Sequence, residues 1–127
     1  MTKVLLGFHG ESAIECYGRS ARHCGYEVDI VQNLSDMLHL ILTGEHGYYL
    51  MDANLGRPNT GNVAPAVEVY ALLKERVEAG LAKFMALSCN RDAVENARQE
   101  NIPAEDKYVF DFMKFMQPLE ARLGQQH

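Results

Sequence analysis

Short apolar runs alternate with helix-like segments along the whole 127-residue chain. Each run is long enough for one buried strand, and between the runs apolar side chains recur every three or four residues, as on one face of a helix. The expected strands are residues 3–8, 27–31, 48–52, 83–88 and 107–110. Because parallel strands need crossover helices between them, this order predicts an α/β fold with a five-stranded parallel sheet and helices on both faces. We expect one domain over residues 1–127.

Capping and turn residues indicate where the helices begin and end. Ser35 and Asn90 are expected N-caps, because their side-chain oxygens can accept hydrogen bonds from free backbone amides. Pro65 suits the first residue of the third helix, and Gly44 and Gly80 suit helix ends. The side chains expected to face the core are Ile14, Tyr17, Ala21, Cys24, Met37, Leu38, Ile41, Leu42, Val69, Leu72, Leu73, Val77, Val94 and Ala97.

The composition argues against several classes of partner. The net charge is −5 and the lysines and arginines are scattered, so we expect no contact with nucleic acid. No apolar run approaches the roughly 20 residues of a membrane helix, and the N-terminus turns polar too soon for a secretory signal. We therefore expect a cytoplasmic protein that does not contact membranes. Cys16, Cys24 and Cys89 lack the spacing of a zinc site and are expected to be reduced and buried.

The third expected strand ends on a carboxylate. Tyr48, Tyr49, Leu50 and Met51 run directly into Asp52, and turn-forming residues follow at once. An ionised carboxylate is costly in an apolar core, so a strand that carries it to the edge of the sheet would hold it half exposed for chemistry. The other interpretation is an aspartate that only begins a turn. In parallel α/β sheets, ligand sites form where the strands have their carboxyl ends.

The strand ends, taken in order, resemble the receiver domains of response regulators, the CheY-like superfamily, over nearly the whole chain. LMDANLGRPNTG is similar to the receiver loop that holds a phospho-accepting aspartate. ALSCN is similar to the end of receiver strand four with its hydroxyl residue, and KYVF is similar to strand five with its aromatic residue. The resemblance agrees with the predicted architecture, which is a flavodoxin-like three-layer sandwich.

The resemblance implies a role for each matching residue. Asp52 would accept a phosphoryl group from a histidine kinase or a phosphotransfer protein. Mg²⁺ would bind weakly between Glu11, Asp52 and the backbone carbonyl of Asn54. Ser88 and Tyr108 would form the switch: the hydroxyl group would hydrogen-bond the phosphoryl oxygens, and the aromatic ring would turn inward when it moves. The added charge would then bias the surface that a downstream protein partner recognises.

The chain departs from the receiver pattern at two strand ends. Phe8 and His9 stand where receivers have two adjacent acidic residues, and this change should weaken Mg²⁺ binding. His9 could either form a local hydrogen bond or ligate a softer ion. The receiver lysine of strand five would fall on Asp111, with Lys107 beside it. An acid in that place would oppose phosphorylation, unless Asp111 simply caps the last helix.

Two further segments are candidate contact surfaces. The loop of residues 53–64 is longer than usual and is expected to be a partner-facing or lid-like insertion, or else a tolerated surface excursion. The last helix is expected within residues 111–123, where four apolar side chains crowd together: Phe112, Met113, Phe115 and Met116. More of them occur than one inward stripe can hide, so we expect self-association or partner docking through the fourth helix, fifth strand and fifth helix, with Met113 or Met116 in the contact. The alternative is a helix that begins early and buries most of them.

Three functions are consistent with these residues. The first is a single-domain receiver of a two-component system, phosphorylated on Asp52, with no enzymatic activity of its own. The second is an atypical receiver-like docking module that regulates without phosphorylation, because the acidic pair and the lysine are missing from their expected places. The third is a small flavodoxin-like hydrolase or ligand-binding protein, although the chain lacks the GxSxG and GxGxxG motifs.

Overall fold

The computed structural model describes residues 2–57 and 60–119. These residues form one parallel sheet in the order β2-β1-β3-β4-β5. The strands are β1 (Lys3–Gly7), β2 (Glu27–Val31), β3 (Tyr48–Asp52), β4 (Lys83–Ser88) and β5 (Ala104–Asp106). The helices are α1 (Glu11–His23), α2 (Leu34–Thr43), α3 (Ala64–Glu78), α4 (Arg91–Gln99) and α5 (Phe112–Phe115). The predicted α/β class and five-stranded parallel sheet are confirmed.

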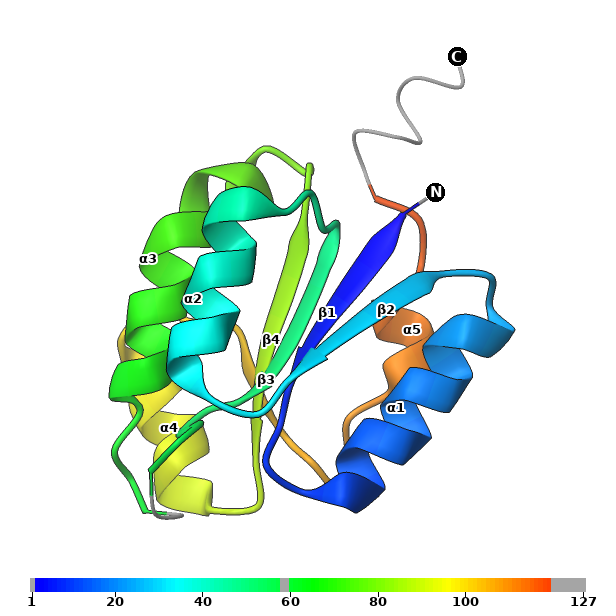
Figure 1. The fold of residues 1–127 in the computed structure, drawn as a ribbon. Helices are drawn as coiled ribbons and strands as arrows, with labels where there is room; N and C mark the ends of the chain where they lie inside the picture. Colours follow the sequence, from blue (N-terminus) through cyan, green and yellow to red (C-terminus); the bar gives the residue numbers. More distant parts are fainter. Residues whose placement is uncertain (1, 58–59, 120–127) are drawn as a thin grey trace.

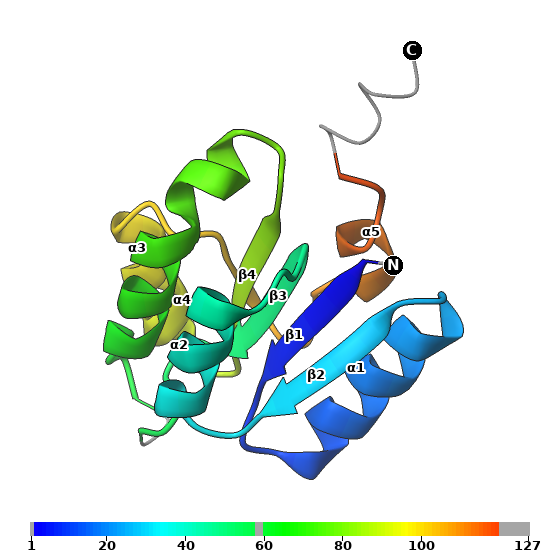
Figure 2. The same ribbon diagram turned by 45° about the horizontal axis from the view of Figure 1, so that its top comes forward.

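The helices cover both faces of the sheet, as a flavodoxin-like sandwich requires. α2, α3 and α4 lie on one face, and α1 and α5 lie on the other (Figure 1). The turned view shows the same division (Figure 2). Because all five strands are parallel, their carboxyl ends meet at one edge of the sheet. The residues that follow β1, β3, β4 and β5 are therefore brought together there.

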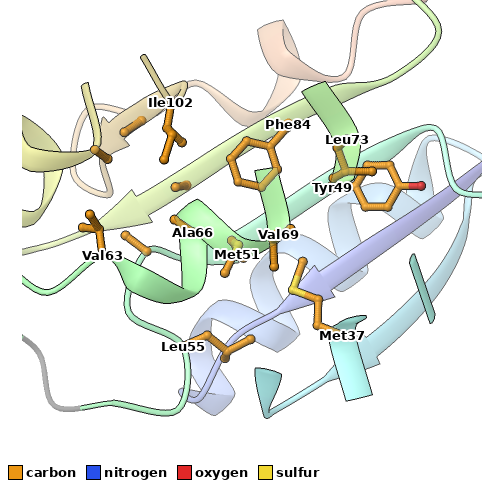
Figure 3. Close-up of a cluster of buried hydrophobic side chains, with 14 of the residues drawn as sticks. Met37, Tyr49, Met51, Leu55, Val63, Ala66, Val69, Leu73, Phe84 and Ile102 are labelled. Atoms are coloured by element: carbon orange, nitrogen blue, oxygen red, sulfur yellow. The ribbon is translucent and has the colours of Figure 1, made fainter. Parts of the chain in front are cut away.

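The larger core lies between the sheet and α2, α3 and α4 (Figure 3). Every residue of β3 is buried, because helices cover both faces of this central strand. Tyr49 and Met51 of β3 belong to this core together with Met37 of α2 and Leu73 of α3. Their packing holds β3 in place and therefore fixes the position of Asp52 at its end.

Aromatic side chains dominate the core on the opposite face. The ring of Tyr17 in α1 lies with its centre 5.4 Å from that of Phe8 and 5.4 Å from that of Phe112. Phe115 contacts Tyr48 of β3, with ring centres 6.0 Å apart. Stacked and edge-to-face rings at such distances add to the stability that burial provides. These contacts attach the four-residue helix α5 to the sheet.

Some predicted details of the helices are wrong. The N-cap of α2 is Asn33, whose Oδ1 accepts the N–H of Asp36 at 2.8 Å, whereas Ser35 lies within the helix. Leu42 is 72% exposed, because it lies one residue beyond Ile41 and is therefore turned away from the buried side of α2. Leu72 of α3 is exposed for the same reason, one residue before the buried Leu73. The predicted N-cap of α4, Asn90, is confirmed.

The cysteines were expected to be buried, and that expectation is also wrong. Cys16, Cys24 and Cys89 are free thiols, and all three are exposed. Cys24 follows the last residue of α1, and Cys89 follows the last residue of β4. Cys24 and Cys89, just beyond an element, no longer follow its inward stripe, whereas Cys16 lies within α1 on its exposed side.

The fifth strand lies three residues earlier than predicted. β5 is Ala104–Asp106, and it pairs with β4 from Ala86↔Ala104 to Ser88↔Asp106. The more apolar segment that was expected to form the strand lies in the turn after it, where the N–H groups of Val109 and Phe110 both donate to the Asp106 carbonyl. The prediction chose residues 107–110 because they are more apolar. In the structure, the shorter and more polar segment 104–106 forms the backbone hydrogen bonds with β4 instead. This shift changes which residue stands at the end of the strand.

The last helix agrees with the alternative interpretation of its sequence. Asp111 caps α5, since its Oδ1 accepts the N–H of Lys114 at 3.0 Å. Phe112, Phe115 and Met116 are buried, whereas Met113 is 57% exposed. The end of the segment predicted to continue to residue 123 lies outside the described residues, as do residues 58 and 59 of the expected lid-like loop. Among the described residues, no helix has the length and apolar character needed to cross a membrane.

Candidate functional site

A polar cavity of about 190 Å³ opens at the carboxyl ends of the strands. Its wall comes from the residues after β1, from the end of β3 and the loop that follows, from the end of β4 and from the residue after β5. The lining residues are His9, Gly10, Asp52, Asn54, Arg57, Ser88, Cys89 and Lys107. Of the predicted site residues, the fold therefore brings Asp52, Asn54 and Ser88 together.

Asp52, the last residue of β3, lines this cavity. It is only 5% exposed, and both of its carboxylate oxygens have partners. Oδ1 lies 2.5 Å from Nζ of Lys107, and Oδ2 accepts the backbone N–H of His9 at 3.0 Å. A nearly buried carboxylate must be paired in this way, because leaving an ionised group in an apolar environment is very costly. These two contacts therefore hold the carboxylate in place at the carboxyl end of β3.

Lys107 corrects the prediction that the strand-five lysine is missing. Because β5 ends at Asp106, the lysine follows the strand directly, and its ammonium group reaches the carboxylate of Asp52. Its backbone N–H also donates to the carbonyl of Ser88 at 3.1 Å, so the end of β4 positions it. Asp111, which was expected in this place, instead caps α5. No acidic residue therefore replaces the lysine next to Asp52.

His9 forms a local hydrogen bond, the first of its two predicted roles. Its Nε2 atom accepts the backbone N–H of Gly56 at 2.9 Å. This bond ties the segment after β1 to the loop after β3. Gly56 has φ of +81°, a left-handed backbone conformation that favours glycine, so the turn that presents this N–H is specified by the sequence. Nε2 of His9 is therefore already in use as an acceptor and is not a free metal ligand.

The two predicted switch residues lie in different environments. Ser88 is buried, lines the cavity, and its Oγ accepts the backbone N–H of Asn90 at 2.9 Å. Tyr108 lies beyond β5, is 83% exposed and does not line the cavity. Its backbone N–H donates to the Asp106 side chain at 2.8 Å, in the turn that follows the strand. The structure thus places Ser88, but not Tyr108, beside Asp52.

The side chains present do not fit a resident Mg²⁺ ion. Glu11 is exposed at the start of α1 and does not line the cavity. The carbonyl of Asn54 accepts the N–H of Arg57 at 2.9 Å, and Asp52 is the one carboxylate among the lining residues. In the part of the chain that the structure describes, no group of three histidine, cysteine, aspartate or glutamate side chains is placed to hold a metal. Mg²⁺ is usually bound through one or two carboxylates, with water completing the octahedron, and here the single lining carboxylate is already paired with Lys107 and the His9 N–H.

The sequence prediction missed Arg57, Cys89 and the pairing of Lys107. Arg57 lines the cavity because the loop after β3 turns back at once: the N–H of Leu55 donates to the Asp52 carbonyl, and that of Arg57 to the Asn54 carbonyl. The turn-forming sequence around Gly56 was a signal for this return. Cys89 follows Ser88 directly and reaches the cavity by adjacency alone.

The cavity also affects an aromatic residue beside it. Burial raises the pKa of the Tyr17 hydroxyl above its usual value of 10.0, and the nearby Cys16, Asp52 and Cys89 raise it further. Each of these groups is negative when ionised, so each disfavours a phenolate in the same region. The phenol of Tyr17 therefore loses its proton less readily in the folded protein than an ordinary tyrosine does.

Comparison with known proteins identifies the fold. No protein-family model matches the sequence, and no curated protein matches it. Solved structures of receiver domains do match, at 14–18% sequence identity. A response regulator protein from Burkholderia pseudomallei, solved with a phosphorylated aspartic acid, a calcium ion and citrate, has a TM-score of 0.68 at 14% identity, covering 99% of this chain and 71% of its own.

Two other matches extend over almost the full length of both chains. A CheY-like response regulator receiver domain from Methylobacillus flagellatus has a TM-score of 0.61 at 18% identity, covering 100% of this chain and 99% of its own. A chemotaxis response regulator of Vibrio cholerae has a TM-score of 0.64 at 15% identity, covering 99% and 98%. The chain therefore has the flavodoxin-like fold of receiver domains.

Proposed function

We propose that this chain is a receiver domain of a two-component system that accepts a phosphoryl group on Asp52 and signals through partner binding. The observation that carries the proposal is the ion pair between Asp52 and Lys107 inside a polar cavity at the carboxyl ends of the strands. The receiver fold of the matching structures supports it, and one of those proteins carries a phosphorylated aspartic acid. The proposed phosphoryl donor is a histidine kinase or a phosphotransfer protein.

In phosphoryl transfer to Asp52, the main contribution of the protein is to position the reacting groups and the charges beside them. An oxygen of the Asp52 carboxylate attacks the phosphorus atom of the donor and forms the new O–P bond, while the bond to the donor nitrogen breaks and the imidazole nitrogen keeps its electron pair. The ammonium group of Lys107 stays beside the charge that arrives, and Ser88 stands in the same cavity with a hydroxyl group that can hydrogen-bond a phosphoryl oxygen. Tyr108 and Glu11 have no part in this proposal, because neither lines the cavity.

The surface beside the site supplies a place for a downstream partner. Tyr108, Val109 and Met113 are exposed apolar residues on the segment that runs from Lys107 to α5. Exposed aromatic and methionine side chains favour adaptable contacts with proteins. We propose that a downstream protein, or a second copy of this chain, binds this face, and that Lys107 links it to the phosphorylation state of Asp52.

An intact-mass measurement tests the proposed phosphorylation. Incubation with acetyl phosphate is expected to add the mass of one phosphoryl group to the wild-type protein. Asp52→Asn should abolish the adduct, because the amide has no nucleophilic carboxylate. Glu11→Gln, which changes an exposed acid outside the cavity, is the matched control and should leave it in place. An adduct that persists in Asp52→Asn would reject Asp52 as the acceptor.

A docking module that works without phosphorylation is the second candidate. Both carboxylate oxygens of Asp52 already have partners in the unmodified protein, so the ion pair needs no phosphoryl group to satisfy it. Phe8 and His9 also stand where the receiver pattern has its acidic pair. If no adduct forms with acetyl phosphate or with a histidine kinase, this candidate is favoured. The face around Met113 would then be its binding surface in the unmodified protein.

A further inference from the structure

We infer that the phosphorylation proposed above proceeds without a divalent cation, and that Lys107 and Arg57 together provide the positive charge that a metal would otherwise supply. The inference rests on the proposed function, since it concerns the charge balance of the same cavity. It departs from the expectation of a weakly bound Mg²⁺ ion. Its basis is the set of charged side chains that line the cavity.

The charges of the lining residues favour an anion and not a cation. Lys107 and Arg57 contribute two positive charges and Asp52 contributes one negative charge, which leaves one positive charge in excess. Phosphorylation replaces the single negative charge of the carboxylate with about −1.5 to −2 charges on the phosphoryl group at neutral pH. The two cations therefore match the phosphorylated side chain almost completely. A cavity with two more carboxylates would instead need a divalent cation to reach the same balance.

The residue at the end of β1 strengthens this arrangement. Phe8 is fully buried, and the centre of its ring lies 5.5 Å from Nζ of Lys107. A ring in that place cannot coordinate Mg²⁺, but its negative face attracts an ammonium group. It also keeps water away from one side of the ion pair, which makes the attraction between Lys107 and an added phosphoryl group stronger.

Arg57 is suited to the second position. It follows Gly56 in the loop after β3 and lines the cavity together with Asp52. A guanidinium group can donate two parallel hydrogen bonds to phosphate oxygens, which a single ammonium group cannot do. Lys107 contacts one carboxylate oxygen of Asp52, and we assign to Arg57, which lines the same cavity, the phosphoryl oxygens that the lysine does not reach.

The reaction with a small acyl phosphate balances without a metal. A carboxylate oxygen of Asp52 forms a bond to phosphorus as the bond between phosphorus and the acyl oxygen breaks. The leaving group is the carboxylate of the donor, which takes the electron pair of the broken bond. No proton and no further reactant are needed. The two cations stabilise the charge on the equatorial phosphoryl oxygens during the transfer.

The test measures the rate of adduct formation with acetyl phosphate by intact mass, in excess chelator and in excess Mg²⁺. Equal rates in the two conditions are expected. Arg57→Gln should slow the reaction in chelator by on the order of tenfold or more, as removal of a charge-stabilising donor does, and Arg57→Lys should restore part of the rate. Arg91→Gln is the matched control, because that arginine is highly exposed on α4.

The outcomes separate this inference from the proposed function. An adduct that forms in Mg²⁺ but not in chelator would overturn the inference and leave phosphorylation of Asp52 intact. No adduct in either condition would reject the proposed function and the inference with it. An unchanged rate in Arg57→Gln would remove Arg57 from the mechanism. A Mg²⁺ titration followed by amide chemical shifts gives an independent answer: saturable shifts at Asp52 and Asn54 in the unmodified protein would also overturn the inference.

Discussion

Phe8 presents its ring to Lys107, with 5.5 Å between the ring centre and Nζ, at the strand end where the receiver pattern has an acidic pair. The same ring lies 5.4 Å from that of Tyr17, which in turn lies 5.4 Å from that of Phe112 in α5. The ion pair at Asp52 is thus packed against the aromatic core that holds the C-terminal segment. If phosphorylation moved Lys107, the packing of the Phe8, Tyr17 and Phe112 rings would change directly.

The first prediction concerns the stability of the ion pair. Lys107→Met should lower the free energy of unfolding by about 1–3 kcal/mol, between the values for exposed and fully buried pairs, because it leaves the carboxylate of Asp52 without its cation. Asp52→Asn in the same background should recover part of the loss. Urea unfolding of both single variants and the double variant gives the coupling energy. Strictly additive effects would show that the two side chains do not interact in solution.

The second prediction concerns metal binding at the end of β1. His9→Asp places a second carboxylate beside Asp52 and removes the acceptor of the Gly56 N–H. The variant should be less stable than the wild type without metal, and Mg²⁺ should stabilise it. Mass action gives about 2.7 kcal/mol when the free ion is at a hundred times Kd.

Thermal unfolding across a Mg²⁺ series measures this effect, with His9→Asn as the control that removes the imidazole without adding charge. The wild type and His9→Asn should not respond to the ion. Equal stabilisation of all three proteins would mean that Mg²⁺ acts elsewhere on the surface.

The third prediction concerns pH. The pKa of Tyr17 is raised in the folded protein by burial and then by Cys16, Asp52 and Cys89, so the unfolded chain loses this proton first. The stability that depends on the neutral phenol is complete below pH 10.0 and is lost as the pH rises through the raised pKa. Stability should therefore fall less steeply above this pH in Tyr17→Phe than in the wild type.

Urea unfolding at several alkaline pH values provides the measurement. Tyr108→Phe removes a phenol from an exposed position and is the matched control. It should follow the wild-type curve. Identical slopes in the wild type and Tyr17→Phe would show that the phenol of Tyr17 ionises as easily in the folded protein as in the unfolded chain.

The fourth prediction concerns the proposed contact face. Met113→Glu should weaken self-association or binding of a downstream partner by about tenfold or more, because it places a charge on an exposed apolar surface without disturbing the core. Leu42→Glu is the control, since Leu42 is equally apolar and is 72% exposed on α2. Sedimentation and partner titration measure the effect. Equal binding by both variants would place the contact face elsewhere.

Much of the architecture was predictable from local patterns. The bounds of β2, β3 and β4 agree with the predicted strands, because each is a separate run of residues suited to a strand and bounded by turn or capping residues. Asp52 was identified because a carboxylate that ends a buried strand is unusual. Asn90 was identified as a helix cap from its residue type and place. These features depend on interactions between near neighbours in the chain, which is why the sequence alone indicates them.

The charge balance of the site was decided only by the tertiary structure. Nothing in the segment around Lys107 shows that the strand ends just before it, because pairing with β4 selected residues 104–106 over the more apolar segment that follows. The strand ends four residues earlier than expected, so Lys107 follows it and pairs with Asp52, whereas Asp111 caps α5. Phe8, Arg57 and Lys107 are distant in sequence, and they meet because parallel strands end at the same edge of the sheet. Such contacts depend on strand register and loop return, which are properties of the folded chain as a whole.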